Sequence, residues 1–265
     1  MASWSSDDAQ PSSREGLRKS AQPLTFTLGV IMNPKHYLSV DERLLGVCAY
    51  CGGAPNTRDH VPSRFFMDDP LPDNLPVVDA CVTCNQGFSL DEEYVACFLE
   101  CVLVGSTDVE HIRRDKVKQA LSRNPQLVER IRSSAHVNGN GSLTWLPESD
   151  RVRNIVLKLA RGHIAYELSL TQLDAPDEIH FFPLAVVSED DRNAFENAGT
   201  NQFRPWPEVG SRAFLRACDA EPYDNQQGQW VIVQPGRYRY SVDQYGGVRV
   251  QMVLSEYLAC IVDWV

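Results

Sequence analysis

The stretch that decides the fold reads CAYCG at residues 48–52, RDHVP at 58–62 and CVTCN at 81–85. It contains two cysteine pairs, each with two residues between its members, and an Asp-His step between the pairs. Such spacing is typical of a tetrahedral zinc site, because each pair forms a tight turn that presents both thiolates to one ion. We therefore predict a structural zinc held by Cys48, Cys51, Cys81 and Cys84.

The plainer alternative is that these are ordinary core cysteines, since free cysteine is often buried. Two matched pairs in a segment rich in Gly and Pro favour the metal site. The other four cysteines show no such partner pattern, although two of them share a helix face. We expect all four to pack in the core: Cys97, Cys101, Cys218 and Cys260.

Composition bounds the class of protein. The chain has 265 residues, of which 43% are hydrophobic, enough for one large domain or two modest ones. The polar N-terminus lacks the charged start, apolar run and cleavage site of a secretory signal, so a reducing compartment is expected. No apolar run is long enough to cross a bilayer. We expect a soluble, cytoplasmic protein.

The charge is uneven along the chain. A net charge of -10 argues against a dedicated nucleic-acid binder, which usually displays a basic surface. One segment, 111–132, nevertheless has seven positive residues against two acidic ones: Arg113, Arg114, Lys116, Lys118, Arg123, Arg130 and Arg132. This segment either contacts a phosphate backbone, with Arg113, Arg114, Lys116 and Lys118 as the contact residues, or is simply a solvated face.

Patterning predicts an α+β fold, in which a small zinc-stapled finger is followed by helices and then by a C-terminal helix and antiparallel sheet. We predict three regions: a disordered tail at 1–23, a finger domain with a helical extension at 24–137, and an α+β domain of unknown role at 138–265. A short strand is expected at 24–31.

Helical spacing predicts a helix from Ser89 to about Val104 that ends at Gly105, with Ser89 and Glu92 as a capping box. Further helices are expected at 108–122, 127–131 and 149–168, the last weakened by Gly162. A turn is expected at 138–142, where the sequence reads NGNGS. The C-terminal strands are predicted at 179–187, 230–233, 237–242 and 248–265, with a turn at 245–247.

The order of residues around the cysteines resembles the HNH endonuclease family, whose ββα-metal finger is stapled by four cysteines. The matching residues lie between about 45 and 95: Cys48-Ala49-Tyr50-Cys51-Gly52, Asp59-His60-Val61-Pro62, Asn74-Leu75 and Cys81-Val82-Thr83-Cys84-Asn85. The resemblance implies that His60 is the general base. It also implies that Asp59 and Asn85 hold a catalytic Mg2+ or Mn2+ ion, and that Asn74 orients the His60 ring.

Each of these residues also has an ordinary interpretation. An Asp-His pair is usually part of a surface loop, Asn85 could cap the next helix, and Asn74 could belong to a turn. The chain also departs from the family, because Phe88 stands where many members carry Lys or His. Arg58 and Arg64 are the nearest substitutes for that positive charge, or else are solvated surface residues.

We therefore expect a metal-dependent endonuclease that hydrolyses DNA phosphodiester bonds. The alternative is a catalytically inactive zinc-binding module that contacts nucleic acid or protein. Cutting both strands would require a homodimer or two successive cleavage events by one active site. By analogy alone, an intracellular nuclease with an extra domain suggests a role in defence against foreign DNA, with a partner protein of such a system.

Overall fold

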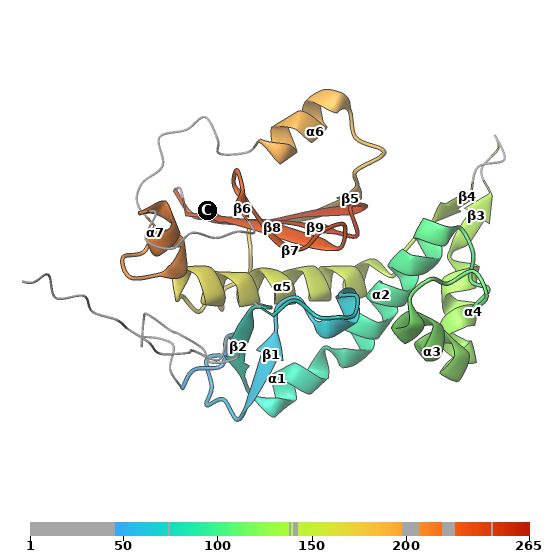
Figure 1. Cartoon of the computed structure of the whole chain (residues 1–265), viewed down its shortest axis with the longest axis horizontal. Helices are drawn as coiled ribbons and strands as arrows, with labels where there is room; N and C mark the ends of the chain where they lie inside the picture. Colours follow the sequence, from blue (N-terminus) through green and yellow to red (C-terminus); the bar gives the residue numbers. More distant parts are fainter. Residues whose placement is uncertain are drawn as a thin grey trace, which may run out of the picture. The chain divides into compact units, whose positions relative to one another are not determined.

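The structure of the protein is a computed structural model that describes residues 46–73, 75–137, 139, 143–197, 207–218, 226–244 and 246–265. These residues all fall within one compact unit, residues 34–265. The predicted tail at 1–23, the predicted strand at 24–31 and Asn74 lie outside the described residues. The fold is α+β, as predicted, with antiparallel sheets and helices (Figure 1).

We call residues 46–87 the finger. After the turn that carries Cys48 and Cys51, it has two short antiparallel strands, β1 (Thr57–His60) and β2 (Val77–Ala80), followed directly by helix α1 (Val82–Gly87). Successive side chains of a strand point to opposite faces, so Asp59 and His60 lie on different faces of β1. Asp59 is buried, whereas Arg58 is exposed and His60 is half-buried.

Helix α2 (Ser89–Val104) has the predicted bounds and ends at Gly105, which adopts the left-handed conformation with φ of 69°. The predicted capping box is wrong. The Ser89 hydroxyl donates to the Gln86 carbonyl, and Glu92 pairs with Lys158. The physical reason is that Phe88, the residue before the helix, is itself helical (φ -90°, ψ -16°), so α1 runs into α2 without the extended cap residue that the motif needs.

The basic segment forms α3 (Asp115–Arg123) and α4 (Pro125–Ser133). The predicted helix at 108–122 begins later because residues 109–111 form a turn and Arg114 is extended. The predicted short helix at 127–131 is longer, since Asn124 caps α4 by accepting from the Leu127 N–H. Strands β3 (Ala135–Val137) and β4 (Leu143–Trp145) pair in antiparallel fashion, and the turn predicted between them at 138–142 lies, apart from Gly139, outside the described residues.

The C-terminal region is a helix, α5 (Ser149–Leu168), and a six-stranded antiparallel sheet of order β5-β10-β9-β8-β7-β6. The strands and two further helices are β5 (Glu178–Pro183), α6 (Glu189–Glu196), α7 (Arg212–Ala217), β6 (Gln226–Gln227), β7 (Trp230–Gln234), β8 (Tyr238–Asp243), β9 (Val248–Leu254) and β10 (Leu258–Trp264). The run predicted as one strand at 248–265 is two strands. A turn at Ser255 and Glu256, with φ of 54° and 48°, divides it without the glycine that usually signals such a turn.

Helix α5 lies between the finger and the sheet (Figure 1). On the sheet side, His163 Nε2 lies 2.8 Å from the Tyr238 hydroxyl, and the Tyr240 hydroxyl donates to Glu167. On the finger side, Gly162 meets Val61, the residue after His60. One hydrophobic cluster runs from Cys48 to Trp264, so buried residues on both sides of position 138 share a core, and the predicted division there stays a prediction.

Within the described part of the chain, we find no helix with the length and apolar character needed to span a bilayer.

Replacing Gly162 with Ala tests the packing of α5 on the finger. A methyl group there would lie 2.6 Å from Val61 Cγ2, too close without displacing one element. We expect a loss of about 1–3 kcal/mol in the free energy of unfolding, measured by urea denaturation. Gly87→Ala is the control, because a methyl group at Gly87 meets nothing within 4 Å. Equal stability of the two variants would contradict the close approach.

Candidate functional site

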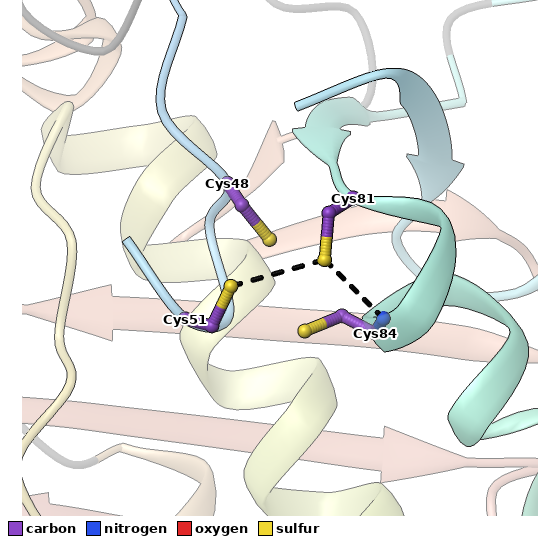
Figure 2. Close-up of side chains that lie close together, drawn as sticks. All are labelled: Cys48, Cys51, Cys81 and Cys84. Atoms are coloured by element: carbon purple, nitrogen blue, oxygen red, sulfur yellow. Dashed lines mark hydrogen bonds between the residues drawn. The ribbon is translucent and has the colours of Figure 1, made fainter. Parts of the chain in front are cut away.

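The four predicted zinc ligands come together (Figure 2). Cys48 and Cys51 lie in the turn before β1, Cys81 is the residue that precedes α1, and Cys84 lies within α1. Their sulfur atoms lie within 4.8 Å of one another, and none is in a disulfide. The sulfurs of Cys51 and Cys81, which come from different pairs, are 3.8 Å apart.

The cluster fits a metal such as zinc. Four sulfurs at about 2.3 Å from one ion, arranged tetrahedrally, are about 3.8 Å apart, which is the separation of the Cys51 and Cys81 sulfurs. The Cys84 backbone N–H donates to the Cys81 sulfur and, as the largest cause, lowers the pKa of Cys81 to about 7. Burial, followed by the neighbouring thiols, raises the pKa of Cys84. Such thiols would need a cation to become thiolates together.

Backbone hydrogen bonds hold the cysteine turn against the strands. The Ala49 N–H donates to the Asp79 carbonyl of β2, and the Cys48 N–H donates to the Gly53 carbonyl. Asn56 accepts from the Val82 N–H at the start of α1. The turn, the hairpin and the helix are therefore one tied unit.

His60 lies at the end of β1, half-buried, next to Arg64. The Arg64 guanidinium lies 3.0 and 3.3 Å from His60 Nε2, so this nitrogen accepts and the ring is neutral in that arrangement. Burial, followed by the positive charge of Arg64, lowers the pKa of His60. A neutral imidazole with an available nitrogen is the form that a general base requires.

Asp59 points to the opposite side, into the core. Its Oδ2 accepts from the Tyr50 hydroxyl at 2.7 Å and lies 2.7 Å from Lys158 Nζ on α5. The same ammonium pairs with Glu92 on α2. Burial raises the pKa of Glu92, and burial together with Asp59 raises that of Tyr50. Asp59, Glu92 and Lys158 form one buried ion cluster.

The sequence prediction missed Lys158 and Glu92 in this role. They lie 66 residues apart, and Lys158 is 99 residues from Asp59, so no local spacing links them. The available signal was a lysine inside a helix with apolar neighbours, where burial requires a partner of opposite charge.

Asp59 and Asn85, the predicted ligands of a catalytic divalent ion, do not fit that role in the arrangement that the structure shows. One oxygen of Asp59 already has two donors, one of them a fixed positive charge that would repel a second cation. Asn85 uses its amide N–H groups to tie α1 to β1, donating to the Arg58 carbonyl at 3.1 Å and to the Thr57 hydroxyl at 3.3 Å. The third predicted residue of the set, Asn74, is not among the described residues.

The basic residues are largely engaged with the protein itself. Arg114 is buried, and its guanidinium donates to Asp68 and to the Phe65 and Met67 carbonyls, which corrects its assignment to the surface. Five of the seven side chains of segment 111–132 form ion pairs: Arg114–Asp68, Lys116–Asp69, Lys118–Glu110, Arg130–Glu148 and Arg132–Glu129. Arg113 is exposed, as is Arg58, which lies 3.8 Å from Asp79.

The remaining cysteines follow the prediction in three positions of four. Cys97, Cys101 and Cys260 are buried. Cys218 is exposed, directly after the short helix α7, so its assignment to the core is wrong. Its position makes it a useful control for experiments on the other thiols.

Zinc content tests the four-cysteine cluster. We expect roughly one zinc ion per purified chain by elemental mass spectrometry. Cys81→Ser should abolish the stoichiometric zinc and destabilise the finger, because metal-binding energy is folding energy in such sites. Cys218→Ser should retain the zinc. Equal zinc in both variants would contradict the assignment.

The pKa of His60 can be measured by NMR titration of its ring protons. We expect a value below the ordinary 6.5. In Arg64→Gln the nearby positive charge is gone, so the imidazolium form is less disfavoured and the pKa should rise toward 6.5. His180→Ala identifies the resonances of an exposed histidine on β5 for comparison. A pKa that falls or stays constant in Arg64→Gln would refute the assigned contact.

No protein-family model, curated protein or solved structure matches this chain. The functional proposal therefore rests on the residues of the site and on the resemblance of their order to one family.

Proposed function

We propose that this protein is an endonuclease that hydrolyses phosphodiester bonds of DNA, with His60 as the general base. The observation that carries the proposal is the environment of His60. A half-buried imidazole with a lowered pKa lies on the hairpin that hydrogen bonds of Asn56 and Asn85 tie to α1, the helix that contains Cys84 of the four-cysteine cluster. The HNH-like order of residues around it supports the same reading.

The residues around His60 have the chemistry that this reaction needs. A neutral imidazole accepts the proton of an attacking water. Arg64, whose guanidinium now contacts His60 Nε2, is exposed and offers donors in a planar fork that matches a phosphate. In this proposal Arg64 contacts the scissile phosphate and leaves the His60 nitrogen free for water.

The resemblance adds a divalent ion, Mg2+ or Mn2+, at Asp59 and Asn85. Such an ion would stabilise the negative charge that develops on the phosphate and on the leaving oxygen. We assign no step of the reaction to it, because Asp59 is engaged by Lys158 and Tyr50. The nicking assay with and without EDTA tests whether the reaction requires this ion.

The surface that would contact DNA is smaller than the sequence predicts. Arg114 is structural, and Lys116 and Lys118 are paired with Asp69 and Glu110. We retain Arg58, Arg64 and Arg113 as the contact residues of the proposal, since all three are exposed. Surface pairs such as those of Lys116 and Lys118 are weak and can exchange for a phosphate.

A second candidate function is a zinc-stabilised interaction module without catalysis. The buried ion pair between Asp59 and Lys158 favours it, because the carboxylate expected in the reaction has a purely internal partner. The two candidates differ in whether His60 is needed for any chemistry.

Nicking of supercoiled plasmid, with Mg2+ or Mn2+ and with EDTA, separates the two candidates. We expect the wild-type protein to convert supercoiled to open-circular DNA, and His60→Ala to be slower by about 100-fold or more, since a general base contributes that much. His180→Ala, which removes an exposed histidine paired with Glu178 on β5, should retain activity.

Zinc content must be equal in all three proteins for the comparison to hold. Equal nicking by wild-type protein and His60→Ala would exclude His60 as the base. Absence of nicking in every zinc-loaded protein would favour the interaction module.

A further inference from the structure

We propose that Lys158 is the resident counter-cation of Asp59, so that a divalent ion can bind Asp59 only by competing with the Lys158 ammonium. The inference deepens the proposed function, on which it rests for the kind of ion. It accounts for the difference between the HNH-like residue order, which implies a metal ligand at Asp59, and the structure, in which Asp59 is paired with a lysine.

The first observation is the completeness of the contact. The Lys158 side chain has no exposed surface, and those of Asp59 and Glu92 are 9% and 13% exposed. Nζ lies 2.7 Å from Asp59 Oδ2 and also contacts Glu92 Oε1. The rings of Tyr50 and Phe88 lie 5.7 and 5.5 Å from the ammonium. The cation is thus enclosed by two carboxylates and two aromatic faces.

The second observation is how α5 places the lysine. Lys158 and Gly162 are four residues apart, so they lie on one face of the helix. Lys158 contacts Asp59, and Gly162 meets Val61, two residues further along the same strand direction. The absence of a side chain at Gly162 lets α5 approach closely enough for the ammonium to reach Asp59. The packing of α5 against the finger therefore holds the Lys158 ammonium next to the Asp59 carboxylate.

The third observation is the charge of the cluster. Two carboxylates and one ammonium share a buried space, and the Tyr50 hydroxyl donates to Asp59. Removing the ammonium would leave two carboxylates facing each other, which is strongly unfavourable without a cation. Carboxylate oxygens are the ligands that a hard divalent ion prefers.

The test is Mn2+ binding by the zinc-loaded full-length chain, measured from free Mn2+ by electron paramagnetic resonance. We expect Lys158→Gln to bind Mn2+ at least 10-fold more tightly than the wild-type protein. Asp59→Asn added to Lys158→Gln should abolish the gain. Arg151→Gln is the matched control, because it removes a cation from the same α2–α5 contact, where Arg151 lies 2.5 Å from Asp91, and should leave Mn2+ affinity unchanged.

Equal Mn2+ affinity in the wild-type protein and Lys158→Gln overturns the proposal, as does a gain that survives Asp59→Asn. If Lys158→Gln does not fold without Mn2+, the same comparison is made with Glu92→Gln/Lys158→Gln, in which one carboxylate leaves together with the ammonium. Affinity no tighter than wild type in that variant overturns the proposal as well.

Mn2+ binding and nicking separate the two proposals. A tight, Asp59-dependent Mn2+ site in Lys158→Gln without nicking by any variant would support the competition and contradict the nuclease. Nicking that depends on His60, together with an Mn2+ affinity that is unchanged in Lys158→Gln, would support the nuclease and contradict the competition. Zinc is quantified throughout, so that Mn2+ at the cysteines is not counted.

Discussion

The fold depends on the close contact between α5 and β1. Gly162 allows the helix to approach Val61, and Lys158 crosses from the helix to Asp59. Removing one partner from a buried ion pair leaves an uncompensated charge, which costs about 3–5 kcal/mol. On its opposite side, α5 carries His163 and Glu167, which contact Tyr238 and Tyr240 of the sheet. A single helix thus joins the finger to the C-terminal sheet through polar contacts on both sides.

The cysteine cluster is a separate and more local device. The turn, hairpin and first helix of the finger are short, and segments of this size rarely bury enough apolar surface to be stable alone. Four thiols within 4.8 Å of one another can bind a metal ion, which would supply the missing stability. With a metal bound, the cluster would hold the finger together internally, whereas α5 fixes the position of the finger against the rest of the unit.

The alternation of β1 gives adjacent residues opposite roles. Asp59 points to the core and is neutralised by a lysine from a distant helix, while His60 points outward to Arg64. The two residues that the HNH resemblance treats as catalytic partners consequently differ in accessibility.

The features that the sequence alone determined are local ones. Paired cysteine spacing and the periodicity of α2 and α5 could be read correctly because they depend on neighbours a few residues away. The capping box failed because the chain was already helical at Phe88, and the turn at Ser255 and Glu256 carried no glycine to reveal it.

Only the tertiary structure decided which charges are internal. Arg114 belonged by sequence to a basic surface, yet it holds the backbone of residues 65–67 and pairs with Asp68. Lys158 and Glu92 gave no sign of a connection to Asp59, because they are brought together from separate helices. Burial and pairing of a charge depend on the whole fold, and spacing along the chain does not encode them. For the same reason, the sequence could name the candidate site, but only the fold decided that a lysine occupies it.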